Sequence, residues 1–194
     1  MRRAGEAVQI ELAGGLGFDV VPCFSLKPDY SWEEPFYVIP DGANGWMRTN
    51  PRKDQDWSEQ LHRDNNKTLR KAVKLVKYWN SQNLDGRLQS YFIELAIMKA
   101  FAHQNRSGRI IQEISEGTAL AFGAVRDASI HRSQPAILAG APPVERGDIS
   151  QEDWNLLDAA ARTAQHAWNL ERQGQIQNAI KTWRLVFGDE FAPE

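Results

Sequence analysis

The sequence predicts an α+β protein in which a few short strands come first and several helices follow. Two observations predict this class. In the first fifty residues, apolar side chains alternate with polar ones or gather in short β-branched and aromatic runs, which is typical of strands. From about residue 67 onward, apolar side chains recur every three to four positions, which is typical of amphipathic helices. Strands followed by helices favour a small antiparallel sheet beside a helical lobe.

Composition places the chain among ordinary globular proteins. Its 194 residues, 42% of them hydrophobic and 25% charged, suffice for one domain with a core or for two small lobes. The net charge of −2 gives no general attraction to nucleic acid or anionic membranes, so neither is an expected partner. The single cysteine, Cys23, excludes an internal disulfide and fits a reducing compartment, so we expect a cytoplasmic protein with Cys23 buried and inert.

Three strands are predicted in the first third of the chain. Residues 8–12 alternate apolar and polar side chains, and residues 17–24 form an apolar run that we expect to be a buried strand. The glycines between them predict a hairpin. Residues 36–39 form the third strand, which Pro40-Asp41-Gly42 ends.

The helical pattern begins with Leu69, Ala72 and Val76 on one face. A second helix is predicted over residues 88–103, with Tyr91 among its inward side chains, and one or two short helices over residues 107–130. Residues 133–147 carry three prolines and predict a long loop. Ser150 is an expected N-cap of the next helix, and Gly188 an expected C-cap of the last one.

Asp19 is the first residue with possible chemistry, because it is the one acidic side chain in an apolar run. Burying a carboxylate there is costly unless it meets a cation, a metal or several hydrogen-bond donors. A metal-binding role and a capping role near a loop both fit this pattern.

A second candidate site lies between the first two predicted helices. Basic side chains recur at helical spacing along the first predicted helix: Lys67, Arg70, Lys71, Lys74 and Lys77. We expect the first three to be solvated, whereas Lys77 lies beside aromatic residues near the next helix. There, Ser90 either caps the helix or binds a phosphate together with free backbone N–H groups. Tyr91 either joins the core or stacks on a nucleobase.

Taken in order, these motifs resemble one family. The residues that carry the resemblance are Gly-Phe-Asp-Val-Val-Pro-Cys-Phe at 17–24, Tyr-Val-Ile-Pro-Asp-Gly at 37–42, Trp46 with Thr-Asn-Pro at 49–51, Val-Lys-Leu-Val-Lys-Tyr-Trp-Asn at 73–80, Gln-Ser-Tyr at 89–91, and the last helix with Phe191. They are similar to the bacterial CD-NTases, or SMODS-type nucleotidyltransferases, which are relatives of oligoadenylate synthase and cyclic GMP-AMP synthase.

The resemblance implies a partial polymerase-β-like nucleotidyltransferase sheet followed by a C-terminal helical lobe. Residues 1–60 would be the remnant of the nucleotidyltransferase core, and residues 61–194 the nucleotide-binding lobe. In the family, three acidic residues hold two Mg²⁺ ions, and the third of them matches Asp19, which implies a catalytic, metal-binding role. The lysine that contacts the triphosphate and the Ser-Tyr pair that contacts phosphate and base match Lys77, Ser90 and Tyr91.

By the same resemblance, the complete enzyme would join nucleoside triphosphates, ATP among them, into a cyclic or linear oligonucleotide messenger. Attack of a ribose hydroxyl on an α-phosphate would release pyrophosphate, with metal assistance. In bacteria such messengers serve antiphage defence, so regulatory defence proteins are expected partners.

The sequence departs from the family at its first motif. It has no Gly-Ser dipeptide, and its Asp-x-Asp pattern, Asp54-Gln55-Asp56, follows Asp19 in a polar stretch where solvated or capping acids are expected. We therefore expect a C-terminal part of a nucleotidyltransferase, from a late start, a truncated gene or a split gene. Its missing N-terminal half is a further expected partner. One carboxylate cannot hold two metals, so this chain alone is expected to be inactive.

Two other interpretations of the function stay open. One is a non-catalytic nucleotide-binding or scaffold module that uses Lys77, Ser90 and Tyr91 without turnover. The other is an RNA-terminal nucleotidyltransferase of the archaeal CCA-adding kind. The block at residues 37–51 and the modest net charge disfavour this one, because tRNA binding favours a broad basic surface. The four histidines lack metal-ligand spacing, and most of the seven tryptophans are expected in the core.

Overall fold

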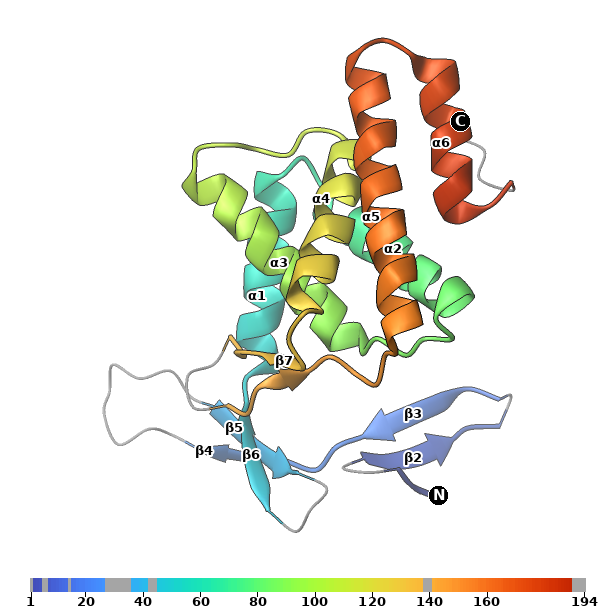
Figure 1. Cartoon of the computed structure of the whole chain (residues 1–194). Coiled ribbons are helices and arrows are strands. Elements are labelled where there is room, and N and C mark those ends of the chain that lie inside the picture. Colours follow the sequence, from blue (N-terminus) through green and yellow to red (C-terminus); the bar gives the residue numbers. More distant parts are fainter. Residues whose placement is uncertain are drawn as a thin grey trace. The chain divides into compact units, whose positions relative to one another are not determined.

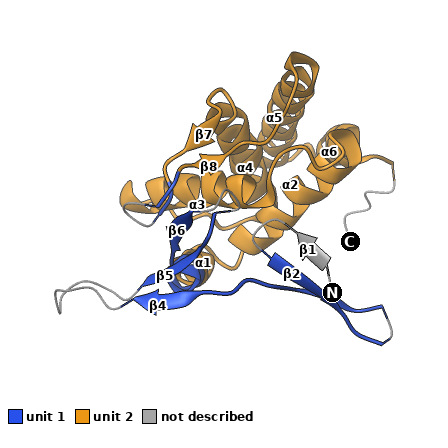
Figure 2. Ribbon diagram, turned by 90° about the horizontal axis from the view of Figure 1, so that it is seen from below, with its two compact units in different colours: residues 1–56, 136–142 blue, residues 57–135, 143–194 orange. Residues whose placement is uncertain are grey.

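The structure is a computed structural model that describes residues 2–4, 7–13, 15–26, 36–41, 45–137 and 141–189. It divides the chain into two compact units (Figure 2). Unit 1 comprises residues 1–56 and 136–142, and unit 2 comprises residues 57–135 and 143–194. Among the described helices, none combines the length and apolar character needed to cross a membrane. Short antiparallel sheets and a helical C-terminal region confirm the predicted α+β class (Figure 1).

The first sheet of unit 1 contains the predicted hairpin. Strands β1 (Arg2–Ala4), β2 (Ala7–Glu11) and β3 (Gly17–Val20) pair antiparallel in that order. In the β2–β3 register, Ile10 faces Phe18 and Gln9 faces Asp19. Because side chains alternate along a strand, the apolar pair and the polar pair lie on opposite faces of the sheet.

The second sheet of unit 1 joins β4 (Phe24–Leu26), β5 (Phe36–Pro40) and β6 (Trp46–Thr49), again antiparallel in that order. Strand β5 confirms the prediction for residues 36–39. Strand β6 was not predicted, because its four residues carry too few side chains to show an alternation. Its pairing with β5, from Tyr37 opposite Thr49 to Pro40 opposite Trp46, is what makes it a strand.

The prediction of one buried strand over residues 17–24 is wrong in two respects. Strand β3 ends at Val20, and Phe24 begins β4, which belongs to the other sheet. Pro22, which has no N–H to donate to a ladder, lies in the link between them. The whole run is also exposed: Phe18 keeps 52% of its surface, and Cys23 is exposed rather than buried. Apolar sequence predicted burial here, but the side chains of residues 17–24 are exposed.

The helices are α1 (Pro51–Asp64), α2 (Leu69–Asn83), α3 (Ser90–Arg106), α4 (Ile114–Ala128), α5 (Gln151–Arg172) and α6 (Ile176–Phe187). All but α1 confirm predicted helices, and residues 107–130 hold a single described helix, α4. The predicted loop at 133–147 contains a two-stranded ribbon of β7 (Ser133–Gln134) and β8 (Val144–Glu145).

Helix α1, which contains the polar stretch around Asp54-Gln55-Asp56, was not predicted from the sequence. These residues lie in the first two turns of α1. Asn50 precedes the helix, and its Oδ1 accepts a hydrogen bond from the backbone N–H of Lys53 at 3.1 Å, which is N-cap geometry. Pro51 occupies the first helical position, where its missing N–H costs nothing. The Asn-Pro pair was the overlooked start signal.

The core of unit 2 is aromatic and aliphatic, and α4 contacts α2, α3 and α5. Phe122 of α4 lies at its centre: its ring centroid is 5.5 Å from Trp79 of α2 and 6.0 Å from Phe187 of α6. Of the described tryptophans, Trp79 and Trp183 are buried as predicted, whereas Trp57, Trp154 and Trp168 are half-buried and Trp46 of unit 1 is exposed. Phe191, part of the family resemblance, lies outside the described residues.

Candidate functional site

The structure groups three of the four predicted site residues. Lys77 lies on α2, and Ser90 and Tyr91 open α3, all within unit 2. Asp19 lies on β3 of unit 1. The site built below therefore consists of the α2–α3 pair of helices.

A contact between the two helices positions Lys77. Its Nζ donates a hydrogen bond to Oε1 of Glu94, in the second turn of α3. Glu94 follows Ser90 by four residues and Tyr91 by three, and residues at these spacings share one face of a helix. The Lys77 ammonium therefore lies beside the face of α3 that carries Ser90 and Tyr91. Glu94 was missed from the sequence; its place one turn after Ser90 was the available signal.

The same face is open to solvent. Ser90 is exposed, Tyr91 keeps 37% of its surface, and Lys77 is half-buried. The prediction that Tyr91 points inward is therefore wrong: Phe92 and Leu95 are buried, and Tyr91 lies at the edge of that stripe. Ser90 is the first residue of α3 rather than its N-cap, which is Gln89, and the side chain of Gln89 makes no capping hydrogen bond.

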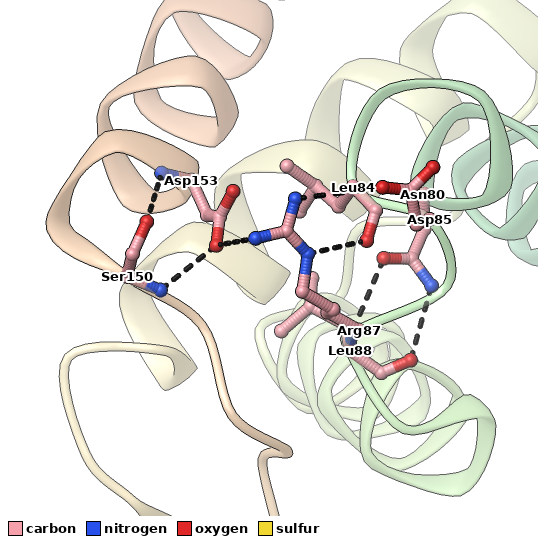
Figure 3. Close-up of polar contacts among 7 residues, drawn as sticks. All are labelled: Asn80, Leu84, Asp85, Arg87, Leu88, Ser150 and Asp153. Atoms are coloured by element: carbon pink, nitrogen blue, oxygen red, sulfur yellow. Dashed lines mark hydrogen bonds and ion pairs between the residues drawn. The ribbon is translucent and has the colours of Figure 1, made fainter.

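The start of α3 is held by Asn80 of α2 (Figure 3). Asn80 is 4% exposed; its Nδ2 donates to the Leu88 carbonyl at 3.0 Å, and its Oδ1 accepts from the Leu88 N–H at 3.2 Å. Leu88 is two residues before Ser90, so this double contact fixes the approach of the chain to the site. The last residue of the Lys-Tyr-Trp-Asn motif is thus structural support, which periodicity did not reveal.

The loop between α2 and α3 is also tied to the start of α5 (Figure 3) and to the segment that follows β8. Arg87 Nη1 contacts Asp153 Oδ2 at 2.8 Å, and the backbone N–H of Gln89 donates to the carbonyl of Arg146 at 3.0 Å. Asp153 and Ser150 form a capping box at 2.8 and 3.2 Å, which confirms the predicted N-cap. The Ser150 N–H is the main reason that the pKa of Asp153 lies below its usual value; burial opposes this shift and the charge of Arg87 adds to it.

The described residues do not fit a two-metal centre. Asp19 faces Gln9 across the hairpin. Within the part of the chain that the structure describes, no three His, Cys, Asp or Glu side chains come close enough together to hold a metal ion. A two-metal site needs several carboxylates around both ions, so we derive no catalytic step through Mg²⁺.

Comparison with known proteins finds similar cyclic nucleotide synthases. No family model matches the chain. It is 27% identical over 199 residues to a probable cyclic nucleotide synthase of Bacillus cereus (strain VD146), a match that covers 98% of the chain and 56% of that protein. It is 22% identical over 161 residues to the cyclic AMP-AMP-AMP synthase of Acinetobacter sp. (strain ATCC 27244 / 9458), covering 80% of the chain and 46% of that protein. These two matches support the resemblance to the CD-NTases.

The fold of the chain agrees with a solved structure. The cyclic AMP-GMP synthase DncV of Vibrio cholerae, a prokaryotic cGAS homologue, matches with a TM-score of 0.64 at 15% identity. The match covers 99% of the chain and 53% of that structure. The chain thus spans about half the length of the proteins it matches, with 56%, 46% and 53% of them covered. The division into a core remnant over residues 1–60 and a nucleotide-binding lobe over 61–194 stays a prediction.

Proposed function

We propose that unit 2 of this CD-NTase relative binds a nucleoside triphosphate through Lys77, Ser90 and Tyr91. The observation that carries the proposal is the contact of Lys77 with Glu94, because it brings a cation to the α3 face that exposes Ser90 and Tyr91. A hydroxyl, an aromatic ring and an ammonium group on one solvent-facing surface are the groups that a nucleotide needs.

The chemistry of each group suits one part of the ligand. The Lys77 ammonium is a compact charge that offsets the charge of phosphate oxygens. Ser90 and the N–H groups of the first turn of α3 can donate to a phosphate, and the helix dipole favours an anion there. The exposed Tyr91 ring offers a surface on which any base can stack.

We further propose that the complete protein joins nucleoside triphosphates into a cyclic or short linear oligonucleotide, with ATP among its substrates. Support comes from two relatives named as cyclic nucleotide synthases, each about twice as long as the matched region. Asp19 is the proposed metal ligand in that protein, with further acids supplied from outside the described residues. The 194-residue chain alone is proposed to be inactive. Roles in antiphage defence and in the cytoplasm stay predictions.

Nucleotide binding without turnover is the second candidate. It is favoured by the lack of a carboxylate cluster among the described residues, since the three binding groups need no metal centre to act. Turnover by a longer form of the protein separates the two candidates.

Calorimetric titration of the 194-residue chain with ATP tests the binding site. We expect Lys77→Ala to weaken binding about tenfold, the loss expected for a charge-assisted contact to phosphate. Lys71→Ala, which removes an exposed lysine of the same helix, is the matched control and should leave the affinity unchanged. Binding that survives the combined Lys77→Ala and Tyr91→Ala changes would place the site elsewhere.

Synthesis is tested by translating the gene upstream of Met1 in frame. The extended protein is then incubated with labelled nucleoside triphosphates and Mg²⁺. A phosphatase-resistant product is expected, and Asp19→Asn should abolish it. An unchanged yield with Asp19→Asn would refute the metal-ligand assignment, while the binding result would stand.

A further inference from the structure

Glu94 places a negative charge inside the proposed triphosphate site. Its carboxylate accepts a hydrogen bond from the Lys77 ammonium, the group proposed to meet the phosphates. It also lies on the α3 face of Ser90, one turn further along the helix. A bound triphosphate would bring several negative charges beside this carboxylate, and like charges at short range repel.

We propose that Glu94 is an intramolecular competitor of the triphosphate and thereby sets nucleotide affinity. In the unliganded chain, Glu94 neutralises Lys77. When the triphosphate binds, the Lys77 ammonium contacts the phosphate oxygens, and its hydrogen bond to Glu94 is broken. This inference rests on the proposed nucleotide-binding role of Lys77, Ser90 and Tyr91.

Exposure of the pair makes the exchange feasible. The side chains of Lys77 and Glu94 keep 30% and 40% of their surfaces, so water reaches both. Ion pairs of this kind are weak because solvent screens them and two flexible side chains must be ordered. Glu94 therefore releases Lys77 at modest cost. The side chain of Lys77 is half-buried on α2, so its position does not depend on Glu94 alone.

A second ion pair on α2 provides a matched control. Arg70 pairs with Glu59 of α1, and this pair is also partly exposed. Arg70 precedes Lys77 by seven residues, which places it two turns, about 10 Å, along the helix. Glu59→Gln thus removes the same charge and the same kind of contact away from the proposed site.

The experiment is a calorimetric double-mutant cycle with ATP on the 194-residue chain: wild type, Glu94→Gln, Lys77→Ala and the double variant. We expect Glu94→Gln to tighten ATP binding about two- to fivefold, the range given by the weakness of exposed pairs. In the Lys77→Ala background, Glu94→Gln should increase the ATP affinity by a smaller factor, because the ammonium for which Glu94 competes with the triphosphate is gone. Glu59→Gln should leave the affinity unchanged.

Two results would overturn the inference while leaving the proposed function in place. One is unchanged or weaker ATP binding by Glu94→Gln when Lys77→Ala still weakens binding, which would make Glu94 a positioning residue or a bystander. The other is an equal gain with Glu59→Gln, which would show a general effect of net charge. If the wild-type chain does not bind ATP, or if Lys77→Ala leaves the ATP affinity unchanged, the proposed function and this inference are both overturned.

Discussion

The side-chain amide of Asn80 closes a two-way hydrogen-bonded ring with the backbone of Leu88, eight residues further along the chain. The ring spans the turn between α2 and α3 and is buried. The ring lies close to the candidate site in the sequence, because Lys77 precedes Asn80 by three residues and Ser90 follows Leu88 by two. The Asn80 amide therefore contributes directly to the relative placement of the proposed phosphate-binding groups.

Replacing Asn80 by alanine should lower the free energy of unfolding by about 2–3 kcal/mol, because it leaves a buried N–H and a buried carbonyl without partners. Urea denaturation measures the change, and hydrogen exchange should speed up in the loop before α3. Asn83→Ala is the control: its Nδ2 donates to the Trp79 carbonyl, but Asn83 is exposed at the end of α2, so a change within about 0.5 kcal/mol is expected. Equal losses for the two variants would contradict the role given to Asn80.

Gly147 should be the glycine of unit 2 least tolerant of a side chain. Its φ is +97°, and a Cβ there would lie 2.1 Å from the carbonyl oxygen of Arg87 in the loop before α3. Gly147→Ala therefore combines backbone strain with a clash against main chain, and we expect a loss of about 3 kcal/mol or more in urea denaturation. Gly174→Ala separates the two effects, because φ there is +75° but nothing lies within 4 Å. It should cost about 1–2 kcal/mol. Similar losses at both positions would mean that the loop moves away freely.

Acidification should destabilise unit 2 through His62. Burial and the charge of Arg70 lower the pKa of His62 below 6.5, and its Nδ1 accepts a hydrogen bond from the backbone N–H of Arg70 at 3.3 Å. The charged groups around it are Arg70, Glu59, Lys67 and Lys71.

Because the folded pKa is the lower one, the unfolded chain binds more protons between the two values. The contribution of neutral His62 is complete above pH 6.5 and is lost as the pH falls through that value toward the folded pKa. Melting temperatures measured between pH 7.5 and pH 5.5 should therefore fall more for the wild type than for His62→Asn, which keeps an acceptor without titrating. Asp153 does not interfere, since its lowered pKa lies under 3.8. Parallel pH profiles for the two proteins would exclude His62 as the cause.

The apolar face of the β2–β3 hairpin should bind hydrophobic dyes. Phe18 faces Ile10 across the hairpin, and both side chains are exposed. Contiguous exposed apolar surface of this kind favours association, whereas single exposed residues do not. Phe18→Thr keeps a strand-forming residue and should lower the fluorescence of bound anilinonaphthalene sulfonate. Leu185→Gln, at an exposed position of α6, should change it little. Equal effects of the two changes would argue against a continuous patch.

Local sequence signals predicted the helices and one hairpin well. Ser150 and Gly188 act at helix ends, where hydrogen bonds form between residues a few positions apart. The register of β2 and β3 follows from a short turn, which the backbone bond from the N–H of Leu12 to the carbonyl of Leu16 closes at 2.8 Å. The start of α1 is also encoded locally, by Asn50 as the N-cap and Pro51 as the first helical residue.

Which side chains are exposed was predicted less well than the positions of the helices. The apolar run containing Asp19 and Cys23 looked buried, yet it is exposed, because burial depends on what packs against a strand and not on the strand itself. Tyr91 belonged to an inward-facing pattern by spacing, but Phe92 and Ile93 take the buried positions of the first turn of α3, and Tyr91 beside them stays 37% exposed.

By itself, the sequence determined the class of the fold, the position of most helices and the candidate residues Asp19, Lys77, Ser90 and Tyr91. Tertiary structure alone decided that Glu94 reaches Lys77 and that Asn80 holds Leu88. The physical reason is the range of the interactions. A helix and its caps are set by contacts within about four residues, whereas the Lys77–Glu94 pair joins side chains seventeen residues apart and exists only because α2 and α3 pack together.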